Sequence, residues 1–383
     1  MIKVGIIGAG AIGPAHVEAI RCLGYVEVVA LCCSSIKSAQ RKAEQLNIPY
    51  AYNDVDEILK HPGLTVIHNC TPNNLHAEIN RKVLMAGKHV FSEKPFCLTI
   101  KEARELVTLA RDKGLMNGVC FVYRHYPMVQ QAASITKQGK AGRVFLTHGG
   151  YLQDWLLYKT DYNWRVDEIQ GGESRAVADI GSHWCDTVQY VTGRKIVAVM
   201  ANLDTVWPIR EIKKDEVLNT FDAKKLFQEK QIKNEDIASV LIKFDDNSSG
   251  VFVVSQVSAG RKNRLYFEIN CSRHSLVWDE EKSEDLILGF RDKPNELLSA
   301  YQTEVCPDSQ ESSPQYIRAY THGGRQEAFR CMMESFYSSL KYDHAHTYKH
   351  DYATFYDGAY GMFIIDAILR SHREKRWVDV ESL

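Results

Sequence analysis

The sequence predicts an α/β protein of two domains, with a doubly wound parallel sheet first and an α+β domain after it. A strand, a glycine-rich turn and a helix open the chain within residues 1–20. Strands and helices then alternate up to residue 123, which is typical of a parallel sheet. Runs of strands joined by turns follow, and they indicate a mixed or antiparallel sheet. A length of 383 residues fits two domains, which we place at 1–123 and 124–383.

The opening segment carries the spacing G-x-G-x-x-G. Residues 3–7 predict a buried strand, Gly8, Gly10 and Gly13 follow, and a helix comes next. In a dinucleotide site the first glycine allows a tight turn and the second lets a pyrophosphate approach the backbone. The third allows close packing of helix and strand, and the helix N-terminus attracts phosphate. The context favours a dinucleotide site over an ordinary strand–turn–helix.

The end of the second predicted strand, residues 26–33, bears on the choice of coenzyme. Sites that prefer NAD usually place Asp or Glu there to bind the ribose 2′-hydroxyl. Here Cys33 and Ser34 are followed by Lys37, with no carboxylate. Small hydroxyls and a cation tolerate a 2′-phosphate, which gives a slight preference for NADP over NAD. The alternative is that Lys37 belongs to the solvated face of the helix at 38–46.

The rest of the first domain continues the alternation. Thr99 and Glu102 form a predicted capping box for a helix that ends at Gly114. The other expected elements are a short helix at 54–59, strands at 65–70, 89–92 and 115–123, and a helix at 77–86.

The second domain is expected to contain five strands and several helices. An aromatic, irregular segment occupies 154–172, and residues 204–236 are polar enough to form an excursion. The expected strands lie at 144–153, 196–203, 238–244, 249–258 and 264–271, and the helices at 128–138, 180–192, 325–341 and 356–371.

Composition excludes several classes of protein. A formal net charge of −1 provides no field to attract nucleic acid or a membrane surface. No apolar run is long enough to span a membrane. The ten cysteines include no C-x-x-C pair, so we expect free thiols in a reducing cytoplasm and no zinc ribbon.

Two segments could carry proton-transfer chemistry. Glu93-Lys94-Pro95 follows a strand at the edge where open α/β sheets bind ligands, and Pro95 favours an extended Lys94. A surface lysine is the alternative. Asp179 and His183 share one face if a helix begins at Ile180, and a carboxylate beside an imidazole suits acid–base catalysis. The alternative makes Asp179 a helix N-cap and His183 a core residue.

Two further segments are less specific. The aromatic faces and polar groups of residues 151–165 suit a sugar or polyol, although a domain or subunit interface uses the same residue types. His344, His346 and His350 lack a matching acid or thiol set. They are expected to form a solvated polar segment, and no metal site is predicted.

These segments together resemble the Gfo/Idh/MocA oxidoreductases, which include glucose–fructose oxidoreductase and inositol dehydrogenase. The resemblance spans essentially the whole chain. Its motifs are GIIGAGAIGPAH, TPNNLH, SEKP, ADIGSHWCD, VSQVSAGRKNRLYFEI and DGAYGMFIIDAILRS. It implies a Rossmann domain followed by a domain with a large open sheet that commonly builds homodimers or homotetramers. The last helix, about 356–371, is expected to pack back towards the first domain.

The resemblance also implies roles for individual residues. Lys94, Asp179 and His183 would surround the reacting alcohol, with His183 as general base and Lys94 stabilising the alkoxide. Arg124, Trp155, Trp164 and Arg165 are expected to contact substrate. The residues expected to line the coenzyme are Gly8, Gly10, Ala11, Ile12, Gly13, Ser34, Lys37, Thr71, Pro72, Asn73, His76, Glu93 and Lys94.

The predicted function is therefore an NAD(P)-dependent oxidoreductase acting on a secondary alcohol of a sugar, sugar derivative or cyclitol. One alternative is a glycosidase that oxidises a sugar transiently with tightly held NAD. A second is a non-catalytic dinucleotide sensor on the same scaffold. The fold does not identify the sugar, the carbon or the direction.

Overall fold

The computed structural model describes residues 1–213, 227–300, 324–341 and 351–383. The chain forms two compact units. The first comprises Met1–Gln131, Ser299–Met362 and Leu383, and the second comprises Ala132–Leu298 and Phe363–Ser382. The sequence patterns predict that the second domain begins at residue 124 and continues to residue 383. The contacts group residues 299–362 with the first unit instead, and in the described part of that stretch the helix Arg325–Lys341 packs on the helix Gly13–Arg21 and on the 3-10 turn Val122–His125.

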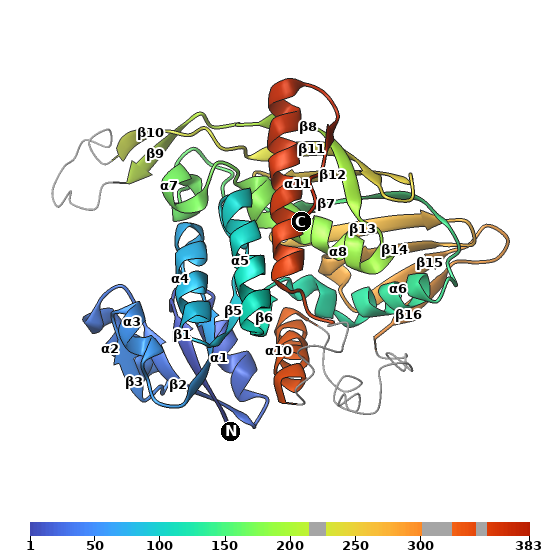
Figure 1. The fold of residues 1–383 in the computed structure, drawn as a ribbon. Helices are drawn as coiled ribbons and strands as arrows, with labels where there is room; N and C mark the ends of the chain where they lie inside the picture. The colour runs from blue at the N-terminus through green and yellow to red at the C-terminus, as the bar shows by residue number, and fades with distance from the viewer. Residues whose placement is uncertain (214–226, 301–323, 342–350) are drawn as a thin grey trace. The chain divides into compact units, whose positions relative to one another are not determined.

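The first unit contains a six-stranded sheet in the order β3-β2-β1-β4-β5-β6 (Figure 1). Its strands are parallel, as predicted, but β3 was not expected from the sequence. The order reverses between β1 and β4, which is where open α/β sheets bind ligands. The strands are β1 (Ile2–Ile7), β2 (Val26–Cys32), β3 (Tyr50–Tyr52), β4 (Leu64–Asn69), β5 (His89–Ser92) and β6 (Asn117–Val119).

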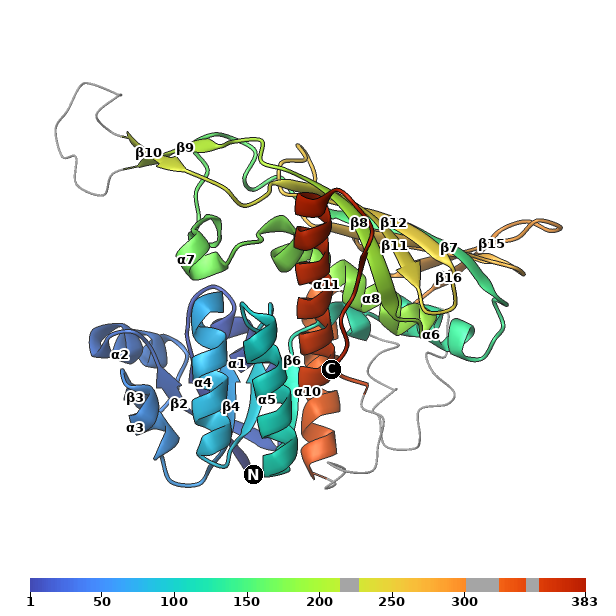
Figure 2. The same cartoon turned by 45° about the horizontal axis from the view of Figure 1, so that its top comes forward.

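Helices cover this sheet and pack in pairs, α4 on α5 and α1 on α10. Figure 2 shows α4 and α5 side by side. The Thr99–Glu102 capping box and the left-handed Gly114 at the end of α5 are confirmed. The helices are α1 (Gly13–Arg21), α2 (Ile36–Gln45), α3 (Val55–Leu59), α4 (Asn73–Met85), α5 (Ile100–Lys113) and α10 (Arg325–Lys341); α6 (Pro127–Lys137) and α11 (Phe355–Glu374) each run from one unit into the other.

Two expectations for the first unit need correction. The strand expected at 115–123 is only three residues long, because the chain leaves the sheet after Val119 and enters the 3-10 turn Val122–His125. The helix expected at 77–86 begins earlier, at Asn73. Pro72 precedes it in an extended conformation and needs no amide partner at a helix start.

The second unit contains a nine-stranded mixed sheet in the order β16-β15-β14-β13-β7-β12-β11-β8-β17. Only β7 and β12 pair in parallel among the pairings of this sheet that the structure describes. Its strands are β7 (Val144–Leu152), β8 (Ile196–Asp204), β11 (Ile237–Phe244), β12 (Ser249–Ser255), β13 (Arg264–Cys271), β14 (Ser275–Asp279), β15 (Asp285–Gly289), β16 (Glu296–Ser299) and β17 (Val378–Asp379).

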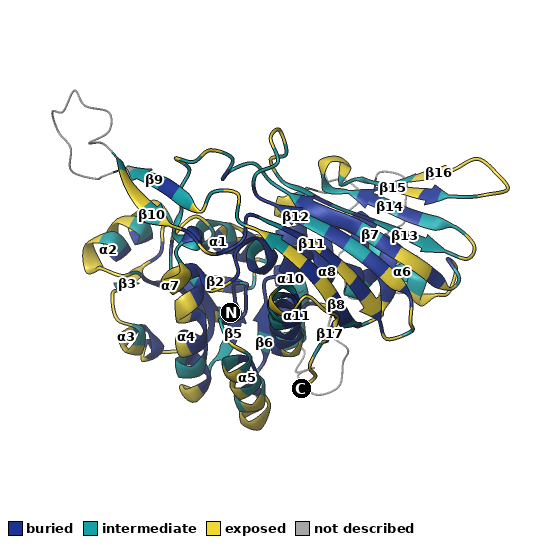
Figure 3. Ribbon diagram, turned by 90° about the horizontal axis from the view of Figure 1, so that it is seen from above, coloured by how far each residue is buried: buried dark blue, intermediate teal, exposed yellow. Residues whose placement is uncertain are grey.

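One face of this sheet is packed and the other is more exposed. Side chains alternate along β11 between buried and exposed, and Figure 3 shows the resulting stripes. On the packed face, Trp184 of α8 (Ser182–Thr192) stacks on Phe252 of β12 with ring centroids 4.6 Å apart.

The excursion expected at 204–236 contains a hairpin of β9 (Ile209–Lys213) and β10 (Phe227–Gln231). Residues 214–226 of it, and the three histidines His344, His346 and His350, lie outside the described residues. Short elements complete the unit: the 3-10 turns Trp164–Val166 and Glu280–Lys282, α7 (Glu168–Gly171) and the π-helical turn Val177–Gly181. Among the described residues, no helix is both long and apolar enough to cross a bilayer.

Candidate active site

The register of the parallel sheet aligns the carboxyl ends of its strands. Ile7 pairs with Cys32 on one side and Asn69 on the other, Asn69 pairs with Ser92, and Ser92 pairs with Val119. The segments that follow these strands therefore emerge along one edge. They are the glycine turn, the Cys33–Lys37 segment, the Thr71–His76 segment and Glu93-Lys94, all of which were predicted from sequence.

The three glycines of the turn face different surroundings. Gly8 has φ +92°, and a Cβ there would lie 2.5 Å from the Cys70 carbonyl oxygen. A Cβ at Gly13 would lie 2.6 Å from the Gly8 carbonyl oxygen. Gly10 has no heavy atom within 4 Å of its Cβ position. Fold geometry thus requires Gly8 and Gly13, whereas Gly10 leaves open space for a ligand.

The start of α1 fits an anion. Ile12 occupies the N-cap without a side-chain hydrogen bond, and the first turn has no acidic residue. Its backbone N–H groups and the helix dipole are available to a negatively charged group. Together with the space over Gly10, this arrangement fits the pyrophosphate of a dinucleotide; Gly10 and Ala11 are exposed.

The segment after β2 is the predicted ribose end of the site. Ser34 and Lys37 are exposed, and Ser35 caps α2 by accepting a hydrogen bond from the Ser38 amide at 3.3 Å. No carboxylate lies between Cys33 and Lys37.

The segment after β4 leads into α4. Thr71 and Pro72 are half-buried and Asn73 is buried, while His76 is 1% exposed. The ring nitrogens of His76 lie 2.7 Å from the Pro95 carbonyl oxygen and 2.8 Å from that of Thr71. Burial lowers the pKa of His76. This histidine therefore joins the two segments that follow β4 and β5.

The carboxylate of Glu93 is buried immediately before the predicted catalytic lysine. His16 Nε2 lies 3.0 Å from Glu93 Oε1, and the Lys94 backbone N–H donates to Oε2 at 3.2 Å. Burial alone would raise the pKa of this carboxyl, but the hydrogen bond from His16 and the neighbouring positive charge of Lys94 hold it well below its usual range.

A metal at this point would compete with an existing contact. His16, Glu93 and Cys120 offer three ligand atoms within 4.8 Å of one another. The histidine and the carboxylate are already joined by the 3.0 Å hydrogen bond, and all three residues are buried.

Arg124 was expected to contact substrate. It is 8% exposed, and its guanidinium lies 3.0 Å from the Asp357 carboxylate. At least part of its hydrogen-bonding capacity is therefore used within the first unit.

In the second unit, Asp179 lies within the π-helical turn Val177–Gly181, which continues directly into α8. The expectation that a helix begins at Ile180 with Asp179 as N-cap is wrong. Single π turns are inserted into helices frequently at functional sites. The Asp179 carboxylate lies 3.2 Å from Arg165 Nε and accepts a hydrogen bond from Gln256 Nε2 at 2.8 Å.

His183 lies on α8 and is 6% exposed, with its ring centroid 6.3 Å from that of Tyr151. Tyr151 belongs to a polar chain on the same unit. Tyr151 Oη and Gln153 Nε2 both donate to Asn263 Oδ1, and Trp155 Nε1 donates to Gln153 Oε1 at 2.8 Å. The aromatic segment therefore presents fixed hydroxyl, amide and indole groups.

Trp164 and Arg165 form a cation–π pair, with the guanidinium 4.3 Å from the ring centroid. Arg165 thus links Trp164 to Asp179. Both predicted substrate residues are half-buried.

A buried ion cluster that the sequence patterns do not predict holds the aromatic segment in place. Asp236 is inaccessible and pairs with Arg175 and Arg210. Arg210 also donates to the carbonyl oxygens of Leu156, Tyr158 and Asp161. The only sequence signal is that an arginine and an acid occur in an otherwise polar excursion, which is equally typical of solvated residues.

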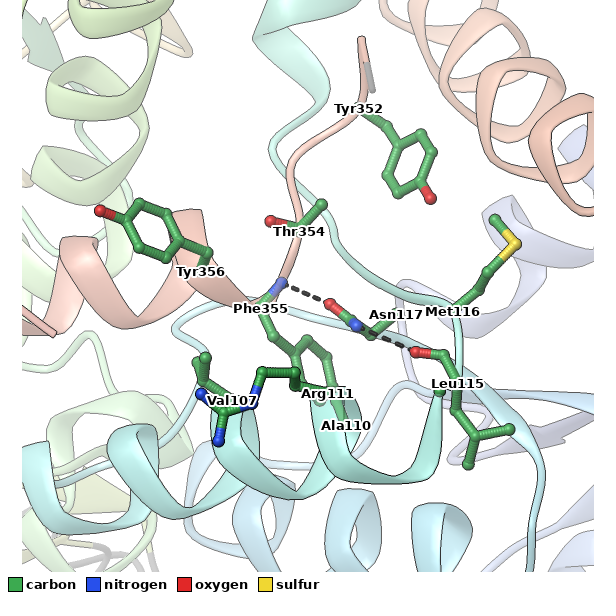
Figure 4. Close-up of a pocket in the computed structure, with 11 residues that line it drawn as sticks. Val107, Ala110, Arg111, Leu115, Met116, Asn117, Tyr352, Thr354, Phe355 and Tyr356 are labelled. Carbon is green, nitrogen blue, oxygen red and sulfur yellow. Dashed lines mark hydrogen bonds between the residues drawn. The ribbon is translucent and has the colours of Figure 1, made fainter. Parts of the chain in front are cut away.

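One pocket of the first unit lies away from this edge. It has a volume of about 280 Å³ and is lined by Arg111, Asn117, Tyr352, Thr354 and Tyr356 among others (Figure 4). Asn117 Oδ1 accepts a hydrogen bond from the Phe355 amide at 2.7 Å. Because Asn117 begins β6, the pocket lies at the amino ends of the strands, opposite the glycine turn.

Comparison with known proteins agrees with this geometry. The family model for the oxidoreductase family with an NAD-binding Rossmann fold matches residues 2–121, and that for the GFO/IDH/MocA C-terminal domain matches residues 129–277. Levoglucosan dehydrogenase of Pseudarthrobacter phenanthrenivorans is 27% identical, over 100% of this chain and 99% of that protein. D-Glucoside 3-dehydrogenase of Escherichia coli is 30% identical, over 50% of this chain and 54% of that protein.

Solved structures extend the similarity to three dimensions. Levoglucosan dehydrogenase in complex with NADH and levoglucosan superposes with a TM-score of 0.86 at 26% identity, and the match covers 100% of both chains. The resemblance inferred from the motifs is thus confirmed over both units. The chain belongs to the GFO/IDH/MocA family of oxidoreductases, and its first unit contains the NAD-binding Rossmann fold of that family.

Proposed function

We propose that this protein is an NAD(H)-dependent dehydrogenase that oxidises a secondary alcohol of a sugar, sugar derivative or cyclitol, or reduces the corresponding ketone. The observation that carries the proposal is the strand edge of the first unit. There, open space over Gly10 and an uncapped helix suit a dinucleotide, and Glu93 holds the backbone of Lys94 at the same edge.

Three residues carry the proposed chemistry. His183 takes the proton of the substrate hydroxyl as general base, and Lys94 donates a hydrogen bond to the same oxygen as negative charge develops. Asp179, held by Arg165 and Gln256, orients the substrate or His183. The bound coenzyme supplies the hydride acceptor. The carbinol carbon loses a hydride and its oxygen loses a proton, which yields the ketone.

The sugar specificity is supported by the aromatic segment and by the relatives. Trp155 and Trp164 offer flat faces for stacking, while Arg165 and Gln153 offer hydrogen bonds. The relatives with the names levoglucosan dehydrogenase and D-glucoside 3-dehydrogenase act on carbohydrates. Arg124 remains a proposed substrate contact from the resemblance alone, since it pairs with Asp357.

For the coenzyme we propose NAD(H). The preference for NADP expected from Ser34 and Lys37 has no support from the comparisons, because the family model is NAD-binding and the levoglucosan dehydrogenase complex contains NADH. An exposed lysine beside exposed serines does not by itself exclude NAD.

The test is a panel of sugars and cyclitols assayed with NAD⁺ and NADP⁺ in parallel, by absorbance of the reduced nicotinamide. On any substrate found, Lys94→Ala and His183→Ala should each lower kcat by roughly 10²–10⁴-fold. Lys101→Ala, which removes an exposed lysine of α5, is the matched control and should keep full activity. Near-full turnover of both active-site variants would refute the assigned roles.

Other outcomes of the panel distinguish the alternatives. Release of an aglycone without accumulation of reduced coenzyme would identify a glycosidase that uses transient oxidation. Coenzyme binding without turnover on any member of the panel would favour a dinucleotide sensor.

We also propose that the exposed face of the nine-stranded sheet forms a homodimer or homotetramer. Among its outward side chains, Leu146, Met200, Leu241 and Ile287 are 38–47% exposed. Apolar side chains gathered on one sheet face favour burial against a partner.

A further inference from the structure

A chain of buried polar side chains connects helix α10 to Glu93, and nothing in the proposed chemistry uses it. We propose that Tyr337, His68 and His16 form a directional hydrogen-bond chain that presents the His16 Nε2–H to Glu93, so that His16 is a positioning residue for Lys94. The functional part of this inference rests on the proposed role of Lys94.

The geometry of the chain is continuous. Tyr337 Oη lies 2.7 Å from His68 Nε2, His68 Nδ1 lies 2.8 Å from His16 Nδ1, and His16 Nε2 lies 3.0 Å from Glu93 Oε1. Tyr337, His68 and His16 are completely buried, and Glu93 is 7% exposed. The four residues come from α10, β4, α1 and the end of β5.

Their burial determines the positions of the protons. Within the described part of the chain, the Tyr337 hydroxyl has one hydrogen-bond partner, His68 Nε2. A buried O–H must donate or lose the free energy of a hydrogen bond, so Nε2 of His68 accepts. Neutral His68 then carries its proton on Nδ1 and donates it to His16 Nδ1. His16 therefore carries its proton on Nε2 and donates to Glu93.

Packing favours a neutral imidazole at His68. His68 stacks against Phe91 and Tyr337, and His16 contacts Phe329 edge-on at a centroid distance of 5.1 Å. Burial and the neighbouring His16 lower the pKa of His68 well below its ordinary value, and burial raises that of Tyr337. Neither His68 nor Tyr337 is therefore charged near neutral pH.

The other titratable groups facing the chain are thiols and cations. Cys70 follows β4 and Cys120 follows β6, and burial raises the pKa of both thiols, which stay neutral. Lys94 and Arg325 contribute positive charge, the first beside Glu93 and the second towards Cys120. Glu93 is therefore the negatively charged acceptor at the end of the hydrogen-bond chain.

Glu93 transmits this arrangement to Lys94. One carboxylate oxygen accepts from His16 and the other from the Lys94 backbone N–H, while the Glu93 backbone N–H donates to the Asn69 carbonyl oxygen at 2.9 Å. Without the His16 donor, a carboxylate buried this deeply would take up a proton. The protonated carboxyl would no longer attract the Lys94 ammonium, and it would be a weaker hydrogen-bond acceptor for the Lys94 backbone N–H.

The test compares two substitutions at His16. In His16→Phe the ring is kept and the donor is lost. In His16→Gln the amide restores a donor to Glu93. The carboxyl carbon of Glu93, followed by NMR in protein with labelled glutamate, should titrate at a raised pKa only in His16→Phe. If Glu93 stays ionised from pH 5 to pH 9 in all three proteins, the inference is wrong.

The catalytic readout separates positioning from folding. We expect kcat of His16→Phe to fall by roughly 10–100-fold, as for other residues that orient a reacting group. It should acquire a new acidic limb as Glu93 protonates, with unchanged affinity for NADH. His16→Gln should recover most of kcat and lose the limb. Equal kcat and pH profiles for His16→Phe and the parent would overturn the positioning role and leave the proposed function intact.

The tautomers of His16 and His68 can be observed directly in the parent protein, without an activity assay or a substituted variant. In protein with ¹⁵N-labelled histidine, His68 should be the Nδ1–H tautomer and His16 the Nε2–H tautomer. The reverse tautomers, or one equivalent of zinc in the purified protein, would refute the chain. The proposed function fails separately, if the parent protein shows no turnover on the sugar panel.

Discussion

Substitution of Gly10 separates the requirement of the fold from that of the ligand. In Gly10→Ala the new Cβ meets no protein atom within 4 Å, and φ at this residue is not in the left-handed region. The apo protein should therefore be as stable as the parent, or gain about 0.4–1 kcal/mol because the unfolded chain loses freedom. The added methyl group should therefore weaken only the binding of a ligand that approaches the backbone at Gly10.

The size of that cost follows from the contacts it blocks. A pyrophosphate held away from the start of α1 loses one charge-assisted hydrogen bond to a backbone N–H, worth about 1.5–3 kcal/mol. At 1.4 kcal/mol for each factor of ten, NADH affinity should fall by roughly 10–150-fold. In Gly8→Ala we expect the main loss in stability and not in NADH affinity. The new Cβ would lie 2.5 Å from the Cys70 carbonyl oxygen, and the residue has φ +92°. That variant should lose about 1–3 kcal/mol of stability or more.

The assay measures NADH binding by nicotinamide fluorescence and apo stability by urea unfolding. Gly289→Ala in β15 is the control, since its Cβ would meet Ser275 Cβ at an ordinary 3.5 Å in the second unit. It should change neither quantity appreciably. If Gly10→Ala binds NADH as tightly as the parent while remaining folded, the pyrophosphate does not pass over Gly10 and the assignment of this turn is wrong.

Three further predictions concern stability and assembly. Burial holds the pKa of His68 below 6.5 in the folded state, so the unfolded chain binds more protons than the folded chain at acidic pH. The free energy of unfolding should therefore fall as the pH drops below 6.5, by up to about 1.4 kcal/mol per pH unit. Urea midpoints measured against pH should fall less steeply for His68→Gln than for the parent protein. Asp236→Asn leaves two buried arginines without their shared carboxylate and should cost about 3–5 kcal/mol in urea unfolding of the second unit. Asp154→Asn, which breaks an ion pair with an exposed lysine, is the control and should leave the urea midpoint almost unchanged. Leu241→Glu should shift the molar mass from light scattering towards the monomer without unfolding the chain, and an unchanged mass would exclude the β11 surface from the interface.

The sequence predicted the first unit well because its signals are local. The glycine spacing, the capping box at Thr99 and Glu102 and the stop at Gly114 each act within a few residues, and each has its expected structure. Parallel topology then brings the strand ends together without further information, since connected strands of this kind place their carboxyl ends on one edge. The alignment of Ile7, Asn69 and Ser92 follows from that rule.

The π-helical turn at Asp179 shows where local signals end. The residues 177–181 have no composition that distinguishes a π turn from an α turn. The start of this turn is held by Glu235, which is buried in another part of the second unit and accepts hydrogen bonds from the amides of Arg175 and Val177. Burial raises the pKa of Glu235, and the hydrogen bonds that it accepts lower it. A residue about 60 positions away in the sequence therefore contacts this part of the site. The hydrophobic periodicity of residues 177–192 cannot predict that contact.

The chain from Tyr337 to Glu93 extends the same argument to chemistry. His16 and His68 are 52 residues apart, and His68 and Tyr337 are 269 apart, so each histidine taken alone is indistinguishable from a satisfied core residue. Helix α1, strand β4 and helix α10 bring them together only in the folded chain. Once they meet, a neutral pair with fixed tautomers is the arrangement in which every buried nitrogen has a partner. The local motif identifies Lys94 as a candidate, whereas the long-range contacts explain how the carboxylate beside it stays charged in a buried site.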